Sequence, residues 1–246
     1  MKKVVINQSN YIPWKGYFDL IHDADVFIFY DDVQFTVRDW RNRNRIKTPQ
    51  GLIWLTIPAG ADRDRKICDI KIDQHEWQRK HWETIRRCYC RAPFFEKYEE
   101  LFRPIYLDQK WNNLSELNQS LIKLVAQDCL GLKTTFLQSS SFKEEGKGQD
   151  RILNLLKAVG TDVYVSGPAG KDYLEHDRFQ RENIELIWKD YSGYPEYSQF
   201  HLPFEHAVTV LDLLFHVGPE APSYIWGWRG KRHQPVAVSR RGLSHG

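Results

Sequence analysis

The segment DDVQFTVRDWRNRNRIK, residues 31–47, concentrates side chains that bind anions, and we call it the arginine block. Its last twelve residues contain five basic side chains and one acidic side chain. Arg41, Arg43 and Arg45 alternate, so they project from one face if the segment is extended. Because guanidinium groups bind phosphate or carboxylate oxygens bidentately, the block predicts an anion receptor. A solvated edge strand is the alternative. The ligand-binding residues predicted here are Gln34, Arg38, Trp40, Arg41, Asn42, Arg43, Asn44 and Arg45.

The turn NQSNYIPWKGYF, residues 7–18, is a second candidate site. It follows a short apolar strand, and in an open parallel sheet such a turn lies at the edge where ligands bind. Its polar side chains either hydrogen-bond a ligand or cap the following helix. The predicted ligand-binding residues of this turn are Gln8, Asn10 and Tyr11, and Lys15 is a predicted catalytic residue.

Asp31 and Asp32 follow the apolar run 26–30, whose lack of polar alternation predicts a strand covered on both faces. At the end of such a strand the two carboxylates lie on the expected ligand-binding edge. We predict that one of them accepts a proton from an attacking amine. Cation binding and salt bridges to the arginine block are the alternatives. We therefore count Asp32 and Asp31 as candidate catalytic residues and assign no metal site.

Two later segments complete the candidate site. SGPAGKD, residues 166–172, is a small-residue turn between a strand and a helix, whose backbone N–H groups suit an anion. It lacks the spacing of a P-loop, so it does not predict a nucleoside triphosphatase. YSGYPEYSQFHLPF, residues 191–204, is an aromatic loop able to close over a sugar ring or a base. The predicted ligand-binding residues of these segments are Ser166, Gly167, Lys171, Tyr197 and Gln199.

The spacing of histidines and cysteines does not predict a catalytic or metal site. The four cysteines lack the spacing of a disulfide framework, and we expect buried packing thiols in a reducing compartment. A zinc site at Cys88 and Cys90 with His81 is the alternative, but a second ligand pair at metal spacing is missing. No triad or HExxH setting is present. The histidines expected to be structural are His201, His206 and His216.

The elements that must position these residues alternate between strand and helix at both ends of the chain. Such alternation predicts a doubly wound sheet. The predicted strands of the sheet are residues 4–6, 26–30, 134–138, 163–165 and 184–188. In the middle, residues 52–57 and 67–72 predict a hairpin. The helices that follow it are predicted at residues 76–89, 94–105 and 113–129, with Asn113 as an N-cap and Gly131 as a C-terminal stop. The fold class is therefore α/β, a Rossmann-like, mostly parallel sheet flanked by helices, with a β-hairpin and helical insertion at about residues 50–130.

Length and charge narrow the class of protein. A chain of 246 residues suits one well-cored domain, predicted over residues 1–228. Residues 229–246 have no apolar period and predict a flexible tail. The formal net charge of +3 is too small to predict binding of nucleic acid or a membrane surface by the whole protein. No run of about 20 apolar residues and no secretory apolar segment is present, so we expect a cytoplasmic protein without membrane insertion.

Four of these segments together resemble the WbqC-like family. They are NQSNYIPWKGYFDLI, the arginine block, YVSGPAGKDYL, and YSQF followed by LDLLFHVG, in that order over most of the chain. Family members often carry a pattern like HQPNY in the first segment, where this chain has Asn7 and Ser9. The resemblance implies a place among bacterial lipopolysaccharide and O-antigen biosynthesis genes. It also implies substrates such as nucleotide-linked or amino sugars.

We expect a group-transfer enzyme, an acyl- or aminoacyltransferase that modifies a nucleotide-linked amino sugar in surface-polysaccharide biosynthesis. The first alternative is an ATP-dependent ligase or nucleotidylyltransferase, because the opening through ADVFIFYDDVQF is similar to folds such as pantothenate synthetase, without the histidines of their HxGH signature. The second is a non-catalytic module that binds a sugar nucleotide or a carrier. The expected partners are the nucleotide-linked sugar and an acyl donor or carrier protein, not nucleic acid. The sequence identifies no cofactor.

Overall fold

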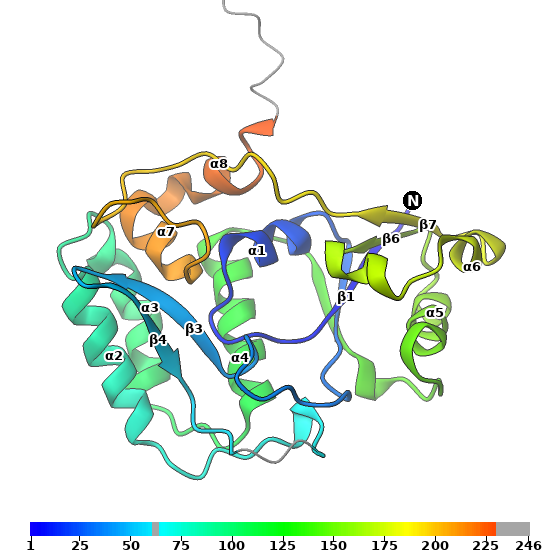
Figure 1. The fold of residues 1–246 in the computed structure, drawn as a ribbon, viewed down its shortest axis with the longest axis horizontal. Coiled ribbons are helices and arrows are strands. Elements are labelled where there is room, and N and C mark those ends of the chain that lie inside the picture. The colour runs from blue at the N-terminus through cyan, green and yellow to red at the C-terminus, as the bar shows by residue number, and fades with distance from the viewer. Residues whose placement is uncertain (61–63, 230–246) are drawn as a thin grey trace, which may run out of the picture.

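Five parallel strands form the central sheet of the protein. The computed structural model describes residues 1–60 and 64–229. The order of strands along the sheet is β5, β2, β1, β6, β7 (Figure 1). Their bounds are β1 Lys3–Asn7, β2 Val26–Phe29, β5 Thr135–Gln138, β6 Val163–Ser166 and β7 Glu185–Trp188. The predicted α/β class with a mostly parallel sheet is confirmed.

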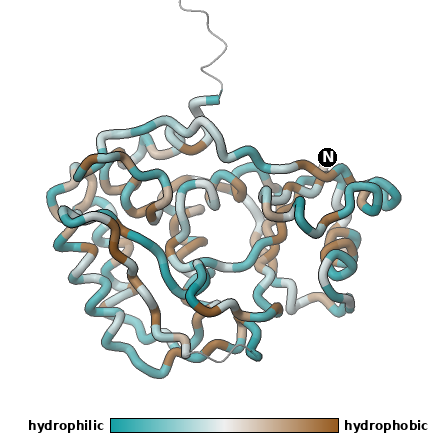
Figure 2. Tube along the Cα trace, in the orientation of Figure 1, coloured by the Kyte–Doolittle hydropathy of each residue, from teal (hydrophilic) through white to brown (hydrophobic). Residues whose placement is uncertain are grey.

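The sheet is covered on both faces. Every residue of β2 and β6 is buried, which is typical of parallel strands between layers of helices. Successive residues of a strand point to opposite faces, so Val5 and Phe27 pack into one hydrophobic cluster while Val4 and Val26 pack into another. The brown stretches of the tube in Figure 2 include these strands. Helices α5 and α6 contribute to the second cluster, whereas α1 and most other helices contribute to the first.

The helices begin and end close to the predicted positions. Asn113 caps its helix by accepting a hydrogen bond from the Glu116 backbone N–H at 3.0 Å, and Gly131 has the positive φ of a helix stop. A π-helical segment, Leu124–Cys129, continues α4. The α-helices are α1 Lys15–His22, α2 Glu76–Tyr89, α3 Phe95–Leu107, α4 Leu114–Lys123, α5 Gly148–Ala158, α6 His176–Arg181, α7 Val210–Val217 and α8 Ala221–Ile225. Short 3-10 segments are η1 Ile67–Asp69, η3 Ser139–Ser141, η4 Pro168–Asp172 and η5 Gly218–Glu220.

The predicted hairpin is present, but one of its strands was assigned wrongly. Strand β4, Gly51–Thr56, pairs with β3, Arg43–Thr48, rather than with residues 67–72. Ile67, Ile70 and Ile72 are buried without joining a regular strand, so their apolar character marks core contacts and not sheet pairing. The arginine block therefore supplies the first strand of the hairpin.

Three further expectations concern the cysteines, the tail and the membrane. The expectation of buried packing thiols is wrong for Cys90, which is exposed, whereas Cys88 and Cys129 are partly buried and pack against the larger hydrophobic cluster. Arg229, the first residue of the predicted tail, binds Asp19, and the rest of that segment, 230–246, lies outside the described residues. The boundary between a domain at 1–228 and a tail stays a prediction. In the described part of the chain, no helix has the length and apolar composition that a membrane span needs.

Candidate functional site

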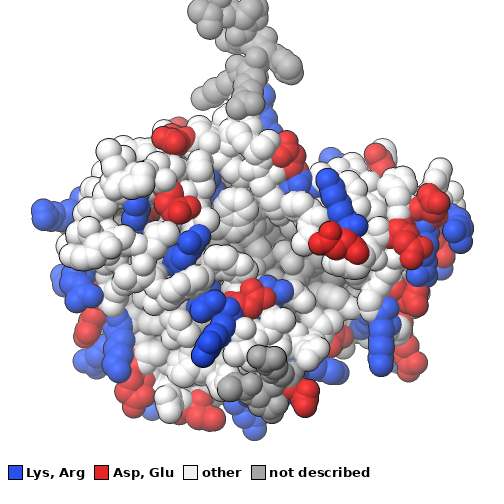
Figure 3. All heavy atoms as spheres, viewed as in Figure 1, with Lys and Arg blue, Asp and Glu red and all other residues white. Residues whose placement is uncertain are grey.

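A cavity of about 600 Å³ opens at the carboxyl ends of the central strands, and we call it the sheet-edge cavity. The strand order reverses at this point, because β2 lies on one side of β1 and β6 on the other. Ligands of doubly wound sheets bind in such a crevice. Figure 3 shows a hollow near the middle of this face. The polar side chains and the small-residue turn that line the cavity include Gln8, Tyr30, Arg41, Ser166, Gly167, Tyr173 and Tyr191.

Arg41 is the one charged side chain among the described residues that line the sheet-edge cavity. Its guanidinium donates hydrogen bonds to the side-chain oxygens of Gln8 and Asn10, the second at 3.2 Å. Asp39 lies 3.5 Å from the same guanidinium. The Asn118 amide holds the Arg41 backbone carbonyl at 2.8 Å. Two neutral amides therefore orient the cation, and one carboxylate partly compensates its charge.

Tyrosines form much of the remaining wall of the sheet-edge cavity. Burial raises the pKa of Tyr30 to about 12, with a smaller contribution from Asp32. Burial likewise raises the pKa of Tyr173 and Tyr191. The phenols are therefore neutral hydrogen-bonding groups with flat faces. One cation among several phenols suits a ligand that carries a ring and an anionic group.

A second cavity lies on the other side of the N-terminal turn, and we call it the tryptophan pocket. Its volume is about 210 Å³, and it is lined by Asn10, Pro13, Trp14, Trp40, Asn44 and Ala207. Gly16 lets the Trp14 ring lie close to the helix, because a Cβ at that position would come within 2.2 Å of the ring. Arg41 binds Asn10 of this pocket and Gln8 of the sheet-edge cavity, so its guanidinium connects the two.

Asparagines and arginines alternate over residues 42–45 of the arginine block, and the two residue types make different contacts. Asn42 and Asn44 are buried and donate to backbone carbonyls of Ile57 and Ile12, at 2.8 Å and 2.6 Å. These amides fix the hairpin and the N-terminal turn. The Arg43 and Arg45 side chains lie on the outer face and pack over tryptophan rings, with Arg43 4.1 Å from the centroid of Trp54.

The comparison with known proteins agrees with the resemblance that the four segments show. Residues 8–224 match the profile of the WbqC-like protein family. The chain belongs to this family. The uncharacterized protein Rv1507c of Mycobacterium tuberculosis (strain ATCC 25618 / H37Rv) is 44% identical over 227 residues, which are 92% of this chain and 98% of that protein. No solved structure matches the chain. The WbqC-like match spans every residue that lines the tryptophan pocket.

Lys15 of this WbqC-like protein lies in an aromatic enclosure next to the tryptophan pocket. Its ammonium is 5.0 Å from the ring centroid of Tyr194 and 5.4 Å from that of Tyr197. Burial lowers the pKa of Lys15 to about 8, and the carboxylates of Asp212 and Glu196 oppose this shift. A lysine in this setting exchanges its proton close to neutral pH.

His206 lies on the same side, one residue before Ala207 of the tryptophan pocket. Burial lowers the pKa of His206, and the positive charge of Lys15 lowers it further, against the opposing carboxylates of Glu196 and Glu205. Its Nδ1 is buried and has no protein hydrogen-bond partner. His206 is therefore a half-buried, neutral imidazole that is adjacent in sequence to the tryptophan pocket without lining either cavity. The structural role expected for it stays a prediction.

Asp31 and Asp32 end β2 as predicted, and their carboxylates bind protein groups. Asp31 accepts from the Ser9 backbone N–H at 2.8 Å, from the Gln119 amide at 3.0 Å and from the Ser115 hydroxyl. Asp32 accepts from Arg151 at 3.2 Å. Neither residue lines the sheet-edge cavity or the tryptophan pocket. The alternative of a salt bridge between these carboxylates and the arginine block is not realised, and Arg151 of α5 pairs with Asp32 instead.

Several other predicted residues line neither cavity. Tyr11 is buried, and its hydroxyl bonds His81 and Tyr106, each at 2.8 Å. Gln34 and Arg38 are exposed, and the Lys171 ammonium lies 6.0 Å from the ring of Trp188. By contrast, the structure brings Gln8, Arg41, Ser166 and Gly167 together around the sheet-edge cavity, and Asn10, Trp40 and Asn44 around the tryptophan pocket.

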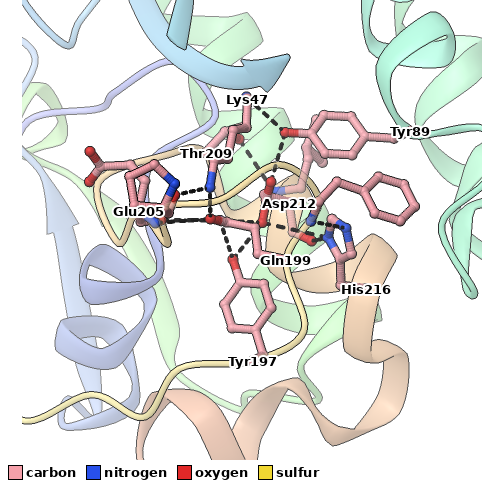
Figure 4. Close-up of polar contacts among 11 residues, drawn as sticks. Lys47, Tyr89, Tyr197, Gln199, Glu205, Thr209, Asp212 and His216 are labelled. Atoms are coloured by element: carbon pink, nitrogen blue, oxygen red, sulfur yellow. Dashed lines mark hydrogen bonds and ion pairs between the residues drawn. The ribbon is translucent and has the colours of Figure 1, made fainter. Parts of the chain in front are cut away.

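Tyr197 and Gln199 join a buried network around Asp212, whose side chain has no exposed area (Figure 4). The Tyr197 hydroxyl donates to Asp212 at 2.6 Å and the Gln199 amide at 2.8 Å. Tyr89 donates to the second carboxylate oxygen at 2.9 Å. The Lys47 ammonium donates to the Gln199 side-chain oxygen at 2.7 Å. The aromatic loop is therefore anchored to α7 and to the hairpin.

One group in the described part of the chain has the spacing of metal ligands, Asp19, His22 and Asp23. The Lys189 ammonium lies 2.9 Å from Asp19 and also contacts Asp23, and the Arg229 guanidinium pairs with Asp19. Cations of the protein therefore occupy these carboxylates, and we assign no metal to them.

Several aromatic lining residues were not among the predicted site residues, although Tyr191 belongs to the aromatic loop expected to close over a ligand. Trp14 and Tyr191 pack with their ring centroids 5.3 Å apart near the N-terminal turn. Trp14 directly precedes α1, and Tyr30 ends the predicted strand 26–30. Tyr173 was not singled out at all. Their positions directly after strands, or in the aromatic loop, were the available signal.

Proposed function

We propose that this WbqC-like protein is an acyl- or aminoacyltransferase that acts on a nucleotide-linked amino sugar. The observation that carries the proposal is the position of Arg41. It supplies the cation of the sheet-edge cavity and holds Gln8 and Asn10, one from each cavity. A fork-shaped cation between two cavities suits a pyrophosphate, which separates the base of a sugar nucleotide from its sugar.

The nucleoside end lies in the sheet-edge cavity in this proposal. Tyr30, Tyr173 and Tyr191 offer neutral hydroxyls and flat faces there, and the cavity lies at the switch point of the sheet. The pyrophosphate lies on Arg41. The amino sugar then reaches Asn10 and presents its amine toward the tryptophan pocket, which Asn10 lines.

His206 accepts the proton that the attacking amine releases. A neutral imidazole is suited to this task, and its lowered pKa keeps it neutral at physiological pH. Lys15 is a positioning residue that acts through its charge on His206. The carboxylates of Asp31 and Asp32 are held by Ser9 and Arg151, which supports a role in shaping the edge of the sheet.

Replacing Arg41 by alanine should weaken binding of the sugar nucleotide by about 1.5–3 kcal/mol, or roughly 10- to 150-fold in Kd, because hydrogen bonds to a charged group are lost. The Arg41→Lys variant should recover only part of this, since an ammonium keeps the charge but not the planar fork. Isothermal titration calorimetry with UDP-, dTDP- and GDP-linked amino sugars measures the effect.

Arg43→Ala is the matched control, because Arg43 packs on Trp54 and does not line the sheet-edge cavity. It should bind the sugar nucleotide like the wild type. Equal affinity of wild type and Arg41→Ala would refute the role of Arg41, and a panel without any binding would refute the substrate class.

Removing the charge of Lys15 should change the pH dependence of transfer. In the Lys15→Met variant the pKa of His206 should rise, because one of the causes that lower it is gone. His206 then becomes protonated at a higher pH, so the acid limb of the kcat/KM profile should move to higher pH. His206→Gln should remove this limb and slow transfer by about 100-fold or more.

Lys110→Met, at an exposed position away from both cavities, controls for the loss of a lysine. The profiles come from rates measured with the sugar nucleotide that calorimetry identifies. If the acid limb of Lys15→Met coincides with that of the wild type, Lys15 does not act through His206.

A further inference from the structure

The tryptophan pocket has the size and walls of a site for a compact apolar group. Trp14, Trp40 and Pro13 supply its apolar surface. An apolar cavity of about 150 Å³ is large enough to hold benzene. The pocket, at about 210 Å³, therefore takes a group of that size or slightly larger.

Arg45 borders this pocket. Its guanidinium lies 5.7 Å from the ring centroid of Trp40 and donates to the Ala207 carbonyl at 2.9 Å, and both residues line the pocket. The same guanidinium is 5.6 Å from the ring of Trp54. Arg45 therefore places a positive charge beside an otherwise uncharged pocket.

An aromatic and cationic strip continues from the pocket along the hairpin. The Trp40 and Trp54 rings have centroids 5.4 Å apart, and the Arg43 guanidinium lies 4.1 Å from the ring centroid of Trp54. Trp40 is 40% exposed and Trp54 is 43% exposed. Figure 3 shows basic side chains over the hairpin on this face. Arg45 thus lies beside the pocket and the Trp40–Trp54 pair, and Arg43 lies on Trp54.

We infer that the tryptophan pocket binds the acyl group of an acyl thioester whose carrier arm ends in phosphate. The acyl group fills the pocket, the uncharged arm lies along Trp40 and Trp54, and Arg45 and Arg43 bind the phosphate groups. This inference rests on the proposed function, because an amine attacks a carboxyl carbon readily only when that carbon is activated. It names the second substrate of the same site.

The transfer balances with these two substrates. The sugar amine attacks the thioester carbonyl, a C–N bond forms, and the C–S bond breaks. The thiolate leaves, and the amine proton passes to His206 and then to the thiolate. The products are the N-acylated sugar nucleotide and the free thiol, and no oxidant or further reactant is needed.

Acetyl-coenzyme A is the probe for this inference, titrated by calorimetry into the full chain without sugar nucleotide. We expect binding to the wild type and about tenfold or greater weakening in Trp40→Ala and in Arg45→Ala, the size of effect for one charge-assisted or cation–π contact. Both variants should bind the sugar nucleotide like the wild type. Arg79→Ala, at an exposed position on α2, is the arginine control and should bind both ligands normally.

Trp40 is partly exposed, so its replacement is expected to leave the melting temperature unchanged, which a thermal scan checks. The inference is overturned if the wild type binds the sugar nucleotide but not acetyl-coenzyme A, or if both variants bind the thioester at wild-type affinity. Competition between the thioester and the sugar nucleotide for one site also overturns it. Binding of the thioester with the expected variant effects, but of no sugar nucleotide, supports the pocket assignment and refutes the proposed function.

Discussion

Replacing Asp19 by alanine should lower the free energy of unfolding by about 3–5 kcal/mol, the range for removal of one partner of a buried charge pair. Asp19 has no exposed area and lies in the middle of α1. The Lys189 ammonium lies 2.9 Å from it, and Arg229 and Tyr194 donate hydrogen bonds to it. Without the carboxylate, the buried ammonium of Lys189 keeps Asp23 and the backbone carbonyl of residue 19 as partners and loses its most buried counter-charge.

Urea denaturation followed by circular dichroism measures this loss at neutral pH. Asp128→Ala is the control, because Asp128 is exposed and forms no ion pair with the described residues, so its removal should change stability little. A loss below about 1 kcal/mol in Asp19→Ala would show that the charged cluster contributes no more than a surface pair.

Replacing Asp212 by alanine should cost about 3 kcal/mol or more, because three buried donors lose their acceptor at once. Tyr89, Tyr197 and Gln199 all donate to its carboxylate (Figure 4). Each donor left unpaired in the interior carries a desolvation penalty of about 1–3 kcal/mol. The effect is measured in the same urea experiment.

The variants Tyr89→Phe and Tyr197→Phe measure how much each tyrosine hydrogen bond to Asp212 contributes to the free energy of unfolding. Each removes a donor together with its hydrogen bond, so each should cost less than Asp212→Ala, about 1 kcal/mol. If one tyrosine variant is as destabilising as Asp212→Ala, the carboxylate is not the centre of the network.

Asp19 and Asp212 hold the aromatic loop from two different helices. Asp19 of α1 binds Tyr194, and Asp212 of α7 binds Tyr197 and Gln199. His206 and Ala207 follow directly after this loop. The anchors therefore place the proposed proton acceptor beside the tryptophan pocket, and the residues expected to bind ligand in the loop are fastened to the protein interior.

Apolar periodicity and local capping were sufficient to predict the central elements. The uninterrupted run 26–30 predicted a strand covered on both faces, and β2 is buried throughout. The spacing of apolar residues predicted α2 at its observed bounds, and Asn113 was recognised as the cap of α4. Each of these signals acts within a few residues, so the sequence alone contains it. The order of strands places the ends of β1, β2 and β6 at one edge, as the alternation of elements predicted.

Long-range contacts distinguish residues that look equivalent in the sequence. Arg41, Arg43 and Arg45 have the same type and the same spacing, yet Arg41 alone of the three lines the sheet-edge cavity. It precedes β3, where the chain passes the N-terminal turn, and residues 8 and 10 supply its partners from more than thirty positions away. Spacing along a strand tells which side chains share a face, but not which of them meets a distant turn. The packing of the hairpin against the N-terminal turn determines which arginine reaches that turn. Asn44 fixes this packing through its hydrogen bond to the Ile12 carbonyl.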